Sequence, residues 1–184
     1  MILPGVIASS GVVASSFESI ATSTVGSGGV ASVTFSSIPQ TFAHLQIRYI
    51  GRDNRTSNTL DTILLQFNSS TTSYYTHYLL GNGTTAAANG FSGSGIEIYR
   101  ITGPSATSGI FGAGVVDILN YTSTTNNKTT RSLAGADLNG SGEIVLGSGL
   151  WYATPAAISS VKLSPTNATL FSEFSSFALY GIKA

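Results

Sequence analysis

The chain has 184 residues, of which only 9% are charged, against about 25% in an average soluble domain. The eight basic and eight acidic side chains cancel, so the sequence offers no electrostatic attraction for nucleic acid or for an acidic membrane surface. Cysteine is absent, which excludes disulfide bonds and thiolate metal sites. A weakly charged surface gives little protection against self-association, so the composition favours a component of an assembly.

The first sixteen residues are small, apolar and rich in serine and glycine, with no lasting period. Pro4 and Gly5 interrupt the opening apolar run and no basic residue precedes it, so we expect neither a secretory signal nor a membrane span. The interpretation is an extended N-terminal arm at 1–16, held by a neighbouring chain. A single domain at 17–184 follows it.

Two strand-like runs follow the arm, at 19–25 and 30–37. The glycine-rich segment 26–29 lies between them, and glycine accepts the positive φ angles of tight turns, so these runs are expected to form a hairpin. The clearest alternation comes next, at 42–50, where Leu45 and Ile47 share one face. Alternation of this kind is typical of a half-buried strand.

The rest of the chain repeats this alternation between turn residues, with no sustained helical period. About ten or eleven short strands of this kind predict an all-β fold, an antiparallel β-sandwich resembling a jelly roll. Residues 84–95 are expected to form a loose connection. The remaining strands are expected at 61–68, 74–80, 96–102, 111–121, 128–138, 143–152, 157–163 and 174–182.

The segment from Asp137 to Glu143 matches the first half of an EF-hand calcium loop, with oxygen-bearing side chains at alternate positions and glycine at the sixth. The twelfth position should carry a bidentate glutamate, and here it is Ser148. Asn-Gly and Ser-Gly are strong turn signals, so we interpret the segment as a turn between two strands, with a weak calcium site as the alternative.

The asparagines offer a second motif, the Asn-x-Ser/Thr sequon of N-glycosylation. Asparagine also gathers in turns, and the turns of this chain are full of Ser and Thr, so the sequons are interpreted as a consequence of composition. They begin at Asn54, Asn68, Asn82, Asn120, Asn127, Asn139 and Asn167.

Acid-base chemistry has few candidates in this sequence. His44 and His77 are the two histidines, and both fall within expected strands, where a structural role is the simpler interpretation. No Gly-x-Ser-x-Gly elbow is present. We therefore assign no catalytic, cofactor-binding or metal-binding residue. Carboxylates that could form a glycosidase pair are Glu97, Asp117, Asp137 and Glu143.

Two further clusters concern binding. Arg48, Arg52 and Arg55 surround Asp53 in a group too small and too mixed in charge for a nucleic-acid site. Aromatic residues could form a sugar-stacking platform, although core or subunit-interface positions are the preferred interpretation. These residues are Tyr74, Tyr75, Tyr78, Trp151 and Tyr152.

Several segments resemble a family of tailed-bacteriophage structural proteins, frequent in phages of aquatic bacteria including cyanophages. The resemblance runs from about Phe17 to the C-terminus. Its most specific part is the closing Ser-Phe-Ala-Leu-Tyr-Gly-Ile. The segments that carry it are His-Leu-Gln-Ile-Arg at 44–48, Lys-Thr-Thr-Arg-Ser-Leu-Ala-Gly-Ala-Asp at 128–137, Asn-Gly-Ser-Gly-Glu at 139–143, Ser-Gly-Leu-Trp at 148–151 and Ser-Ser-Phe-Ala-Leu-Tyr-Gly-Ile-Lys at 175–183.

The resemblance implies a virion structural protein that is not an enzyme. A compact sandwich behind a short arm is similar to head decoration, or cement, proteins, which bind the major capsid protein as small oligomers. We accordingly expect a homotrimer on the capsid surface. The alternative is a tail or fibre component that recognises host glycans through loops such as 52–60 and 81–95.

Overall fold

The computed structural model describes residues 16–153 and 155–183, so the arm expected at 1–16 lies outside the described residues except for Ser16. All the regular secondary structure of the described residues consists of β-strands. These residues contain no helix that could span a membrane. The prediction of an all-β fold is confirmed. The strands are β1 (Phe17–Thr24), β2 (Val33–Phe35), β3 (His44–Gly51), β4 (Leu60–Phe67), β5 (Tyr74–Gly81), β6 (Ala86–Gly93), β7 (Ile96–Thr102), β8 (Gly112–Leu119), β9 (Lys128–Asp137), β10 (Gly142–Trp151), β11 (Val161–Pro165) and β12 (Ser176–Ile182).

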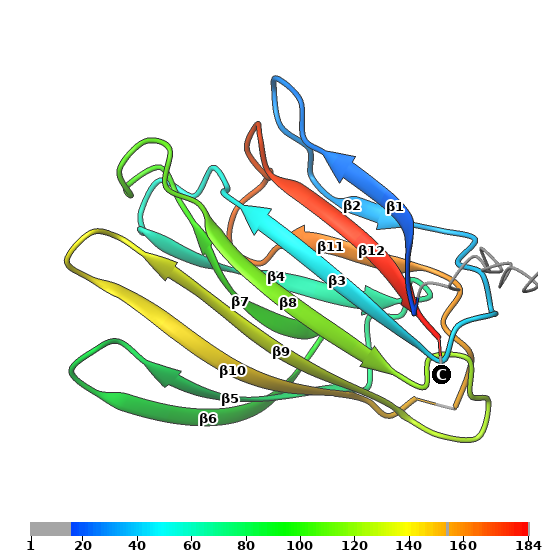
Figure 1. Cartoon of the computed structure of the whole chain (residues 1–184). Helices are drawn as coiled ribbons and strands as arrows, with labels where there is room; N and C mark the ends of the chain where they lie inside the picture. Colours follow the sequence, from blue (N-terminus) through cyan, green and yellow to red (C-terminus); the bar gives the residue numbers. More distant parts are fainter. Residues whose placement is uncertain (1–15, 154, 184) are drawn as a thin grey trace, which may run out of the picture.

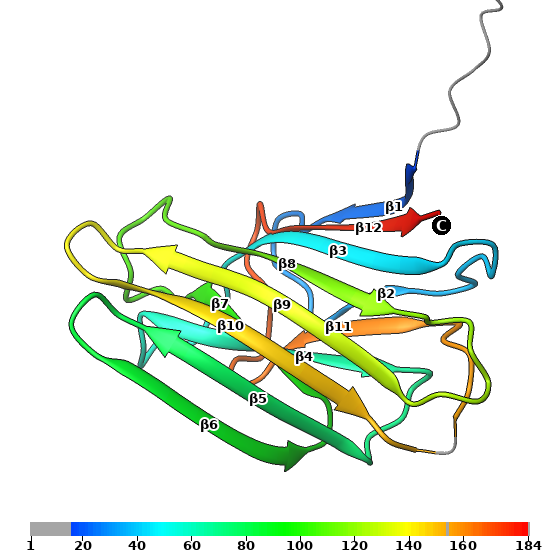
Figure 2. The ribbon, with the colours of Figure 1, turned by 60° about the horizontal axis from the view of Figure 1, so that its bottom comes forward.

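These strands form two antiparallel sheets that face each other as a sandwich (Figure 1, Figure 2). The large sheet has eight strands in the order β1-β12-β3-β8-β9-β10-β5-β6, and the small sheet has four in the order β2-β11-β4-β7. The strands from β2 to β11 follow the strand order of a jelly roll when the meander β8-β9-β10 is counted as one unit. Strands β1 and β12 then extend the large sheet beyond β3.

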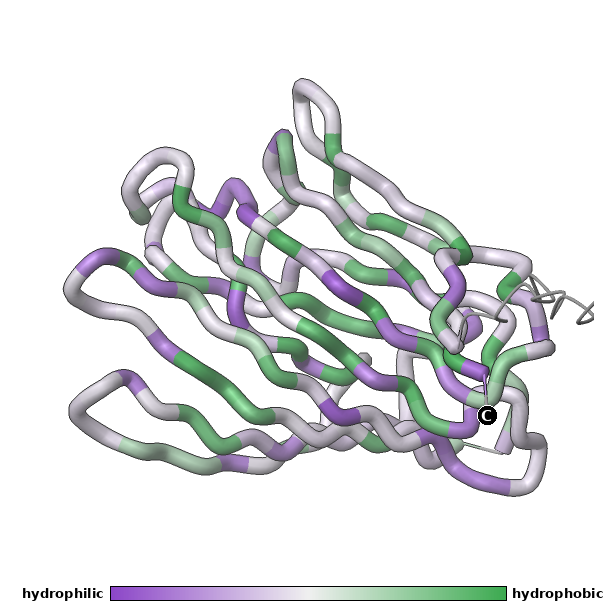
Figure 3. The backbone as a smooth tube through the Cα atoms, viewed as in Figure 1, coloured by the Kyte–Doolittle hydropathy of each residue, from purple (hydrophilic) through white to green (hydrophobic). Residues whose placement is uncertain are grey.

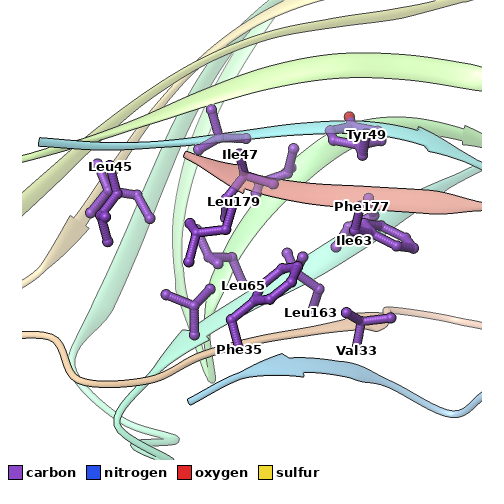
Figure 4. Close-up of a cluster of buried hydrophobic side chains, with 14 of the residues drawn as sticks. Val33, Phe35, Leu45, Ile47, Tyr49, Ile63, Leu65, Leu163, Phe177 and Leu179 are labelled. Carbon is purple, nitrogen blue, oxygen red and sulfur yellow. The ribbon is translucent and has the colours of Figure 1, made fainter. Parts of the chain in front are cut away.

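The core lies between the sheets and is built from the inward side chains of both (Figure 4). On β3, Leu45, Ile47 and Tyr49 are buried, as the alternation predicts, and they face the small sheet. That sheet contributes Ile63 and Leu65 from β4, both fully buried. Burial of such side chains is the main term that stabilises a chain without disulfide bonds.

Two details of the sequence prediction are wrong. Strands β1 and β2 do not form a hairpin, because β1 pairs with β12 in the large sheet and β2 pairs with β11 in the small one. The glycine-rich turn at 26–29 carries the chain from one sheet to the other. At its end the Val30 amide donates to the Phe171 carbonyl at 3.1 Å.

The second error concerns the expected loose connection at 84–95, which contains β6. This strand is rich in alanine, asparagine and glycine, residues that do not favour strands by themselves. It forms because it pairs along its whole length with β5 as the edge of the large sheet. Pairing across a hairpin thus overrides local propensity.

Candidate functional site

The outward face of the large sheet is the most unusual surface of the described molecule. Side chains alternate between the two faces of each strand, so the outward positions of a sandwich are normally polar. Here Leu133 of β9, Leu146 of β10 and Leu79 of β5 are outward and are 48%, 51% and 54% exposed. Figure 3 shows hydrophobic residues recurring along β8, β9 and β10 in the middle of this sheet.

The register of the sheet brings these leucines into one row across four strands. Val115 of β8 pairs with Leu133, Leu133 with Leu146, and Leu146 with Leu79. Directly opposed residues on one sheet face touch through their side chains. The exposed leucines therefore form a continuous apolar row and are not scattered residues.

A second row runs alongside, two residues further along each strand. It contains the exposed Ile50 and Ile144 with small residues beside them, in the register Ile50, Ala113, Gly135, Ile144, Gly81. The small residues leave an open hollow of about 890 Å³ whose lining includes Ala113, Gly135 and Leu133. We call the two rows together the apolar face.

Charged groups border the apolar face along β9. On one side Arg131 donates to Asp117 Oδ2 at 2.7 Å, and Gln46 donates to Asp117 Oδ1 at 2.8 Å. Burial alone raises the pKa of Asp117, but these two hydrogen bonds outweigh it and hold the pKa below its ordinary value. On the other side lies the exposed Asp137 at the end of β9.

A contiguous exposed apolar surface of this kind marks a contact site in soluble proteins. Comparison with known proteins does not assign it. The chain has no significant match among protein-family models, curated proteins or solved structures. The role of the face is therefore inferred from its own residues.

The segment from Asp137 to Glu143 is the turn between β9 and β10, as interpreted from the sequence. The Leu138 amide donates to the Ser141 carbonyl at 2.8 Å, and the Asn139 amide donates to Asp137 Oδ1 at 2.8 Å. Asn139 has a φ of 59°, a conformation that asparagine tolerates in turns. The side chain of Glu143 is occupied elsewhere, in an ion pair with Arg100.

The structure brings His44 near enough to Asp117 for its charge to lower the pKa of Asp117, but it does not gather the acid-base candidates into one site. His44 Nδ1 accepts a hydrogen bond from the Asn120 amide, whereas His77 lies four strands away on β5, against Tyr75. Glu97 accepts a hydrogen bond from the Tyr99 hydroxyl at 3.0 Å. In the described part of the chain, no hydrogen bond joins any two of the four carboxylates that could form a glycosidase pair. Among residues 16–153 and 155–183, no group of three His, Cys, Asp or Glu side chains could hold a metal ion.

The aromatic candidates separate into core and surface. Tyr74 and Trp151 are buried and stack at 6.1 Å between ring centroids, and the Phe67 amide donates to the Tyr74 hydroxyl. Tyr152, directly after β10, is 47% exposed. The preferred interpretation as core residues is thus confirmed for Tyr74 and Trp151.

The three arginines also have separate roles. Arg52 donates to the carbonyls of residues 106, 107 and 110 and fixes the connection after β7. Arg48 lies over the rings of Phe17 and Tyr180 on the outside of the large sheet. Arg55 forms an ion pair with Asp61. The cluster in the sequence is therefore not a shared basic surface.

The sequon asparagines serve the fold in most of the turns where they occur. Their side chains cap turns or bridge loops, and Asn68, Asn120 and Asn139 adopt positive φ. This agrees with the compositional interpretation. Side-chain hydrogen bonds are formed by Asn54, Asn68, Asn82 and Asn167.

Asn68 provides a test of this structural role. Its Oδ1 accepts from the amides of Ser159 and Ser160, and its Nδ2 donates to the Ala157 carbonyl at 2.8 Å. We expect Asn68→Ala to lower the free energy of unfolding by about 2 to 3 kcal/mol, because three hydrogen bonds disappear at a residue with positive φ. Urea unfolding measures this. Asn127→Ala, at an exposed sequon, serves as the control and should change stability by less than about 0.5 kcal/mol.

A pair of buried carboxyl groups escaped the sequence analysis. Asp53 is 0% exposed and Asp61 is 1% exposed, at the end of the small sheet beside Arg55. The Arg55 amide donates to Asp53 Oδ1, while Asp61 Oδ1 accepts from the Arg55 guanidinium at 3.1 Å and from Asn167 at 2.7 Å. Both remaining oxygens are buried without a partner, so a proton shared between the two carboxyl groups completes the arrangement.

The protonation of this pair follows from burial. Desolvation, reinforced by the hydrogen bond to Asp61, raises the pKa of Asp53 to about 7. The alternation in the sequence did indicate that Asp61 is buried, because Asp61 lies on the same face of its strand as the buried Ile63, Leu65 and Phe67. We assign the pair to stability rather than to chemistry, because an arginine already neutralises Asp61.

Proposed function

We propose that this chain is a structural protein of a tailed-bacteriophage virion, a cement protein that binds the outer head lattice and stabilises it. Its partners would be the major capsid protein and further copies of itself, in the homotrimer that the resemblance implies. The observation that carries the proposal is the apolar face, a contiguous exposed surface of the kind that forms contacts with other molecules.

Reinforcement of a capsid requires area and repetition more than strength in any single contact. When one oligomer engages several neighbouring sites, each attachment after the first is intramolecular, and weak contacts combine into firm binding. The near-neutral charge of the chain suits this role, since like-charged copies would repel one another on a lattice. The segments of resemblance support the virion assignment, above all residues 175–183, which include β12.

The test is to label intact phage particles with an antibody against the chain and to locate the label by electron microscopy. Label distributed over the head supports the cement role. Label confined to the tail favours the alternative, a component that recognises host glycans, and specific glycan binding by the isolated chain would then be measured. Particles without label would contradict a virion role.

Attachment also yields a prediction about the arm at 1–16. Its residues are uncharged and largely apolar or small, a composition suited to contact with a neighbour. We expect a chain without residues 1–16 to keep the unfolding midpoint of the full chain but to lose binding to capsids that lack this protein, in a co-sedimentation assay. Equal binding by the truncated and full chains would exclude the arm from attachment.

A further inference from the structure

The apolar face is self-complementary in charge along its central strand. The outward residues of β9 read Arg131, Leu133, Gly135 and Asp137, so a positive charge and a negative charge flank two apolar positions. A two-fold axis that lies in the plane of the contact, perpendicular to β9 and level with Ala134, places a second copy face to face with this order reversed. Arg131 then lies opposite the Asp137 of that copy, and the same pair occurs twice.

Shape matches under the same axis. Leu133, 48% exposed, comes opposite Gly135 of the second copy, where the hollow of about 890 Å³ is open. A large residue opposite a small one is how two sheets interdigitate when they pack face to face. The two copies of this contact are equivalent, so the protruding side chain of each enters the hollow of the other.

The neighbouring strands follow the same pattern, because the axis brings each strand opposite the same strand of the second copy. Val115 of β8 comes opposite Ala113 of the second copy, and Leu146 of β10 comes opposite Ile144, which is also exposed and apolar. Leu79 of β5 comes opposite Gly81 in the same way, so an exposed residue of one row again meets a residue of the other row. The two rows of the apolar face are therefore complementary to each other.

We propose that the apolar face binds a second copy of this chain in a two-fold, face-to-face contact centred on β9. Each side of such a contact presents the same surface, as in most dimers of soluble proteins. This proposal rests on the proposed function and deepens it, because it names the partner that covers the apolar face. A two-fold contact of this kind would link neighbouring oligomers, each of which is held together by a separate interface. Its test needs no virion.

The first experiment is sedimentation equilibrium of the full chain over a wide range of concentrations. We expect a dimer contact in the unaltered chain, and a dissociation constant raised at least roughly 100-fold by Leu133→Asp, which buries a charge in the hollow of each partner. Phe174→Asp is the matched control, because Phe174 is 67% exposed but lies outside the apolar face. It should leave the dissociation constant unchanged.

Charge exchange tests the geometry without relying on Leu133. Arg131→Glu alone and Asp137→Lys alone each bring like charges together at both ends of the contact, and each should weaken the dimer by roughly 10- to 100-fold. An equimolar mixture of the two variants restores opposite charges at both ends, so we expect heterodimers with nearly the original affinity. The double variant Arg131→Glu/Asp137→Lys should likewise dimerise.

Three results would overturn the inference. One is a chain that stays monomeric at every concentration, which would assign the face to another occupant, such as residues 1–15 or a different protein. Another is an oligomer whose affinity is unchanged in Leu133→Asp. The third is a mixture of the charge variants that associates no better than either variant alone. Particle labelling tests the virion role separately, so either proposal can fail without the other.

Discussion

Replacing Phe177 with alanine is expected to remove about 3 to 5 kcal/mol from the free energy of unfolding, the usual cost of emptying a buried phenylalanine site. Phe177 is fully buried on β12, with its ring 4.7 Å from Phe171 and 6.2 Å from Tyr49 between centroids. It joins β12, which lies next to the edge strand β1 of the large sheet, to the small sheet (Figure 4). Small cavities are costly there because the surrounding β-strands cannot close over them.

The effect is large compared with the total stability of a domain, which is about 5 to 15 kcal/mol. Urea unfolding can be followed by the fluorescence of Trp151, the one tryptophan, which is 6% exposed in the folded chain. Phe174→Ala is the matched control three residues earlier, at a side chain that is 67% exposed. It should cost less than about 0.5 kcal/mol. A loss below about 1 kcal/mol in Phe177→Ala would mean that this part of the core is poorly packed.

Strand periodicity predicted most of this fold because one face of nearly every strand meets the core. The alternation in β3 placed Leu45 and Ile47 inward, and both are fully buried. Periodicity says nothing about which strands pair, and this explains the error at β1 and β2. Their partners, β12 and β11, lie near the other end of the chain. Glycines suit a crossing between sheets as well as a hairpin turn.

The apolar face was missed for a related reason. Leu133, Leu146 and Leu79 each occupy an outward position on a different strand, and they belong to separate segments of the sequence. Only the register brings them into a row. A prediction of the face would have required the order β9-β10-β5 in the sheet, which alternation within one strand does not contain.

The stability of the folded chain is expected to rise as the pH falls from 8 to 5, because the Asp53 and Asp61 pair takes up a proton. An isolated aspartic acid has a pKa of 3.8, whereas burial and the hydrogen bond to Asp61 raise the pKa of Asp53 to about 7. The folded state therefore binds a proton that the unfolded state does not bind between these values. The stabilisation is complete below pH 3.8 and is lost as the pH rises through about 7.

At about 1.4 kcal/mol per pKa unit, this predicts a gain of about 2 to 3 kcal/mol between pH 8 and pH 5. Other groups contribute with both signs. Burial raises the pKa of Glu97, which acts in the same direction, whereas hydrogen bonds lower the pKa of Asp117, which acts in the opposite one. The contribution of the pair is therefore measured as a difference between the unaltered chain and Asp53→Asn.

Asparagine at position 53 imitates the protonated carboxyl group. Its oxygen still accepts from the Arg55 amide, and its NH₂ group can donate to the otherwise unpartnered Asp61 Oδ2. We expect urea unfolding of Asp53→Asn at pH 5 and pH 8 to show a pH dependence smaller by about 2 kcal/mol than in the unaltered chain. Glu173→Gln, at an exposed position before β12, should keep the full dependence. If Asp53→Asn kept it too, both carboxyl groups would be ionised in the folded chain, and the burial of the pair would have to be balanced by Arg55 alone.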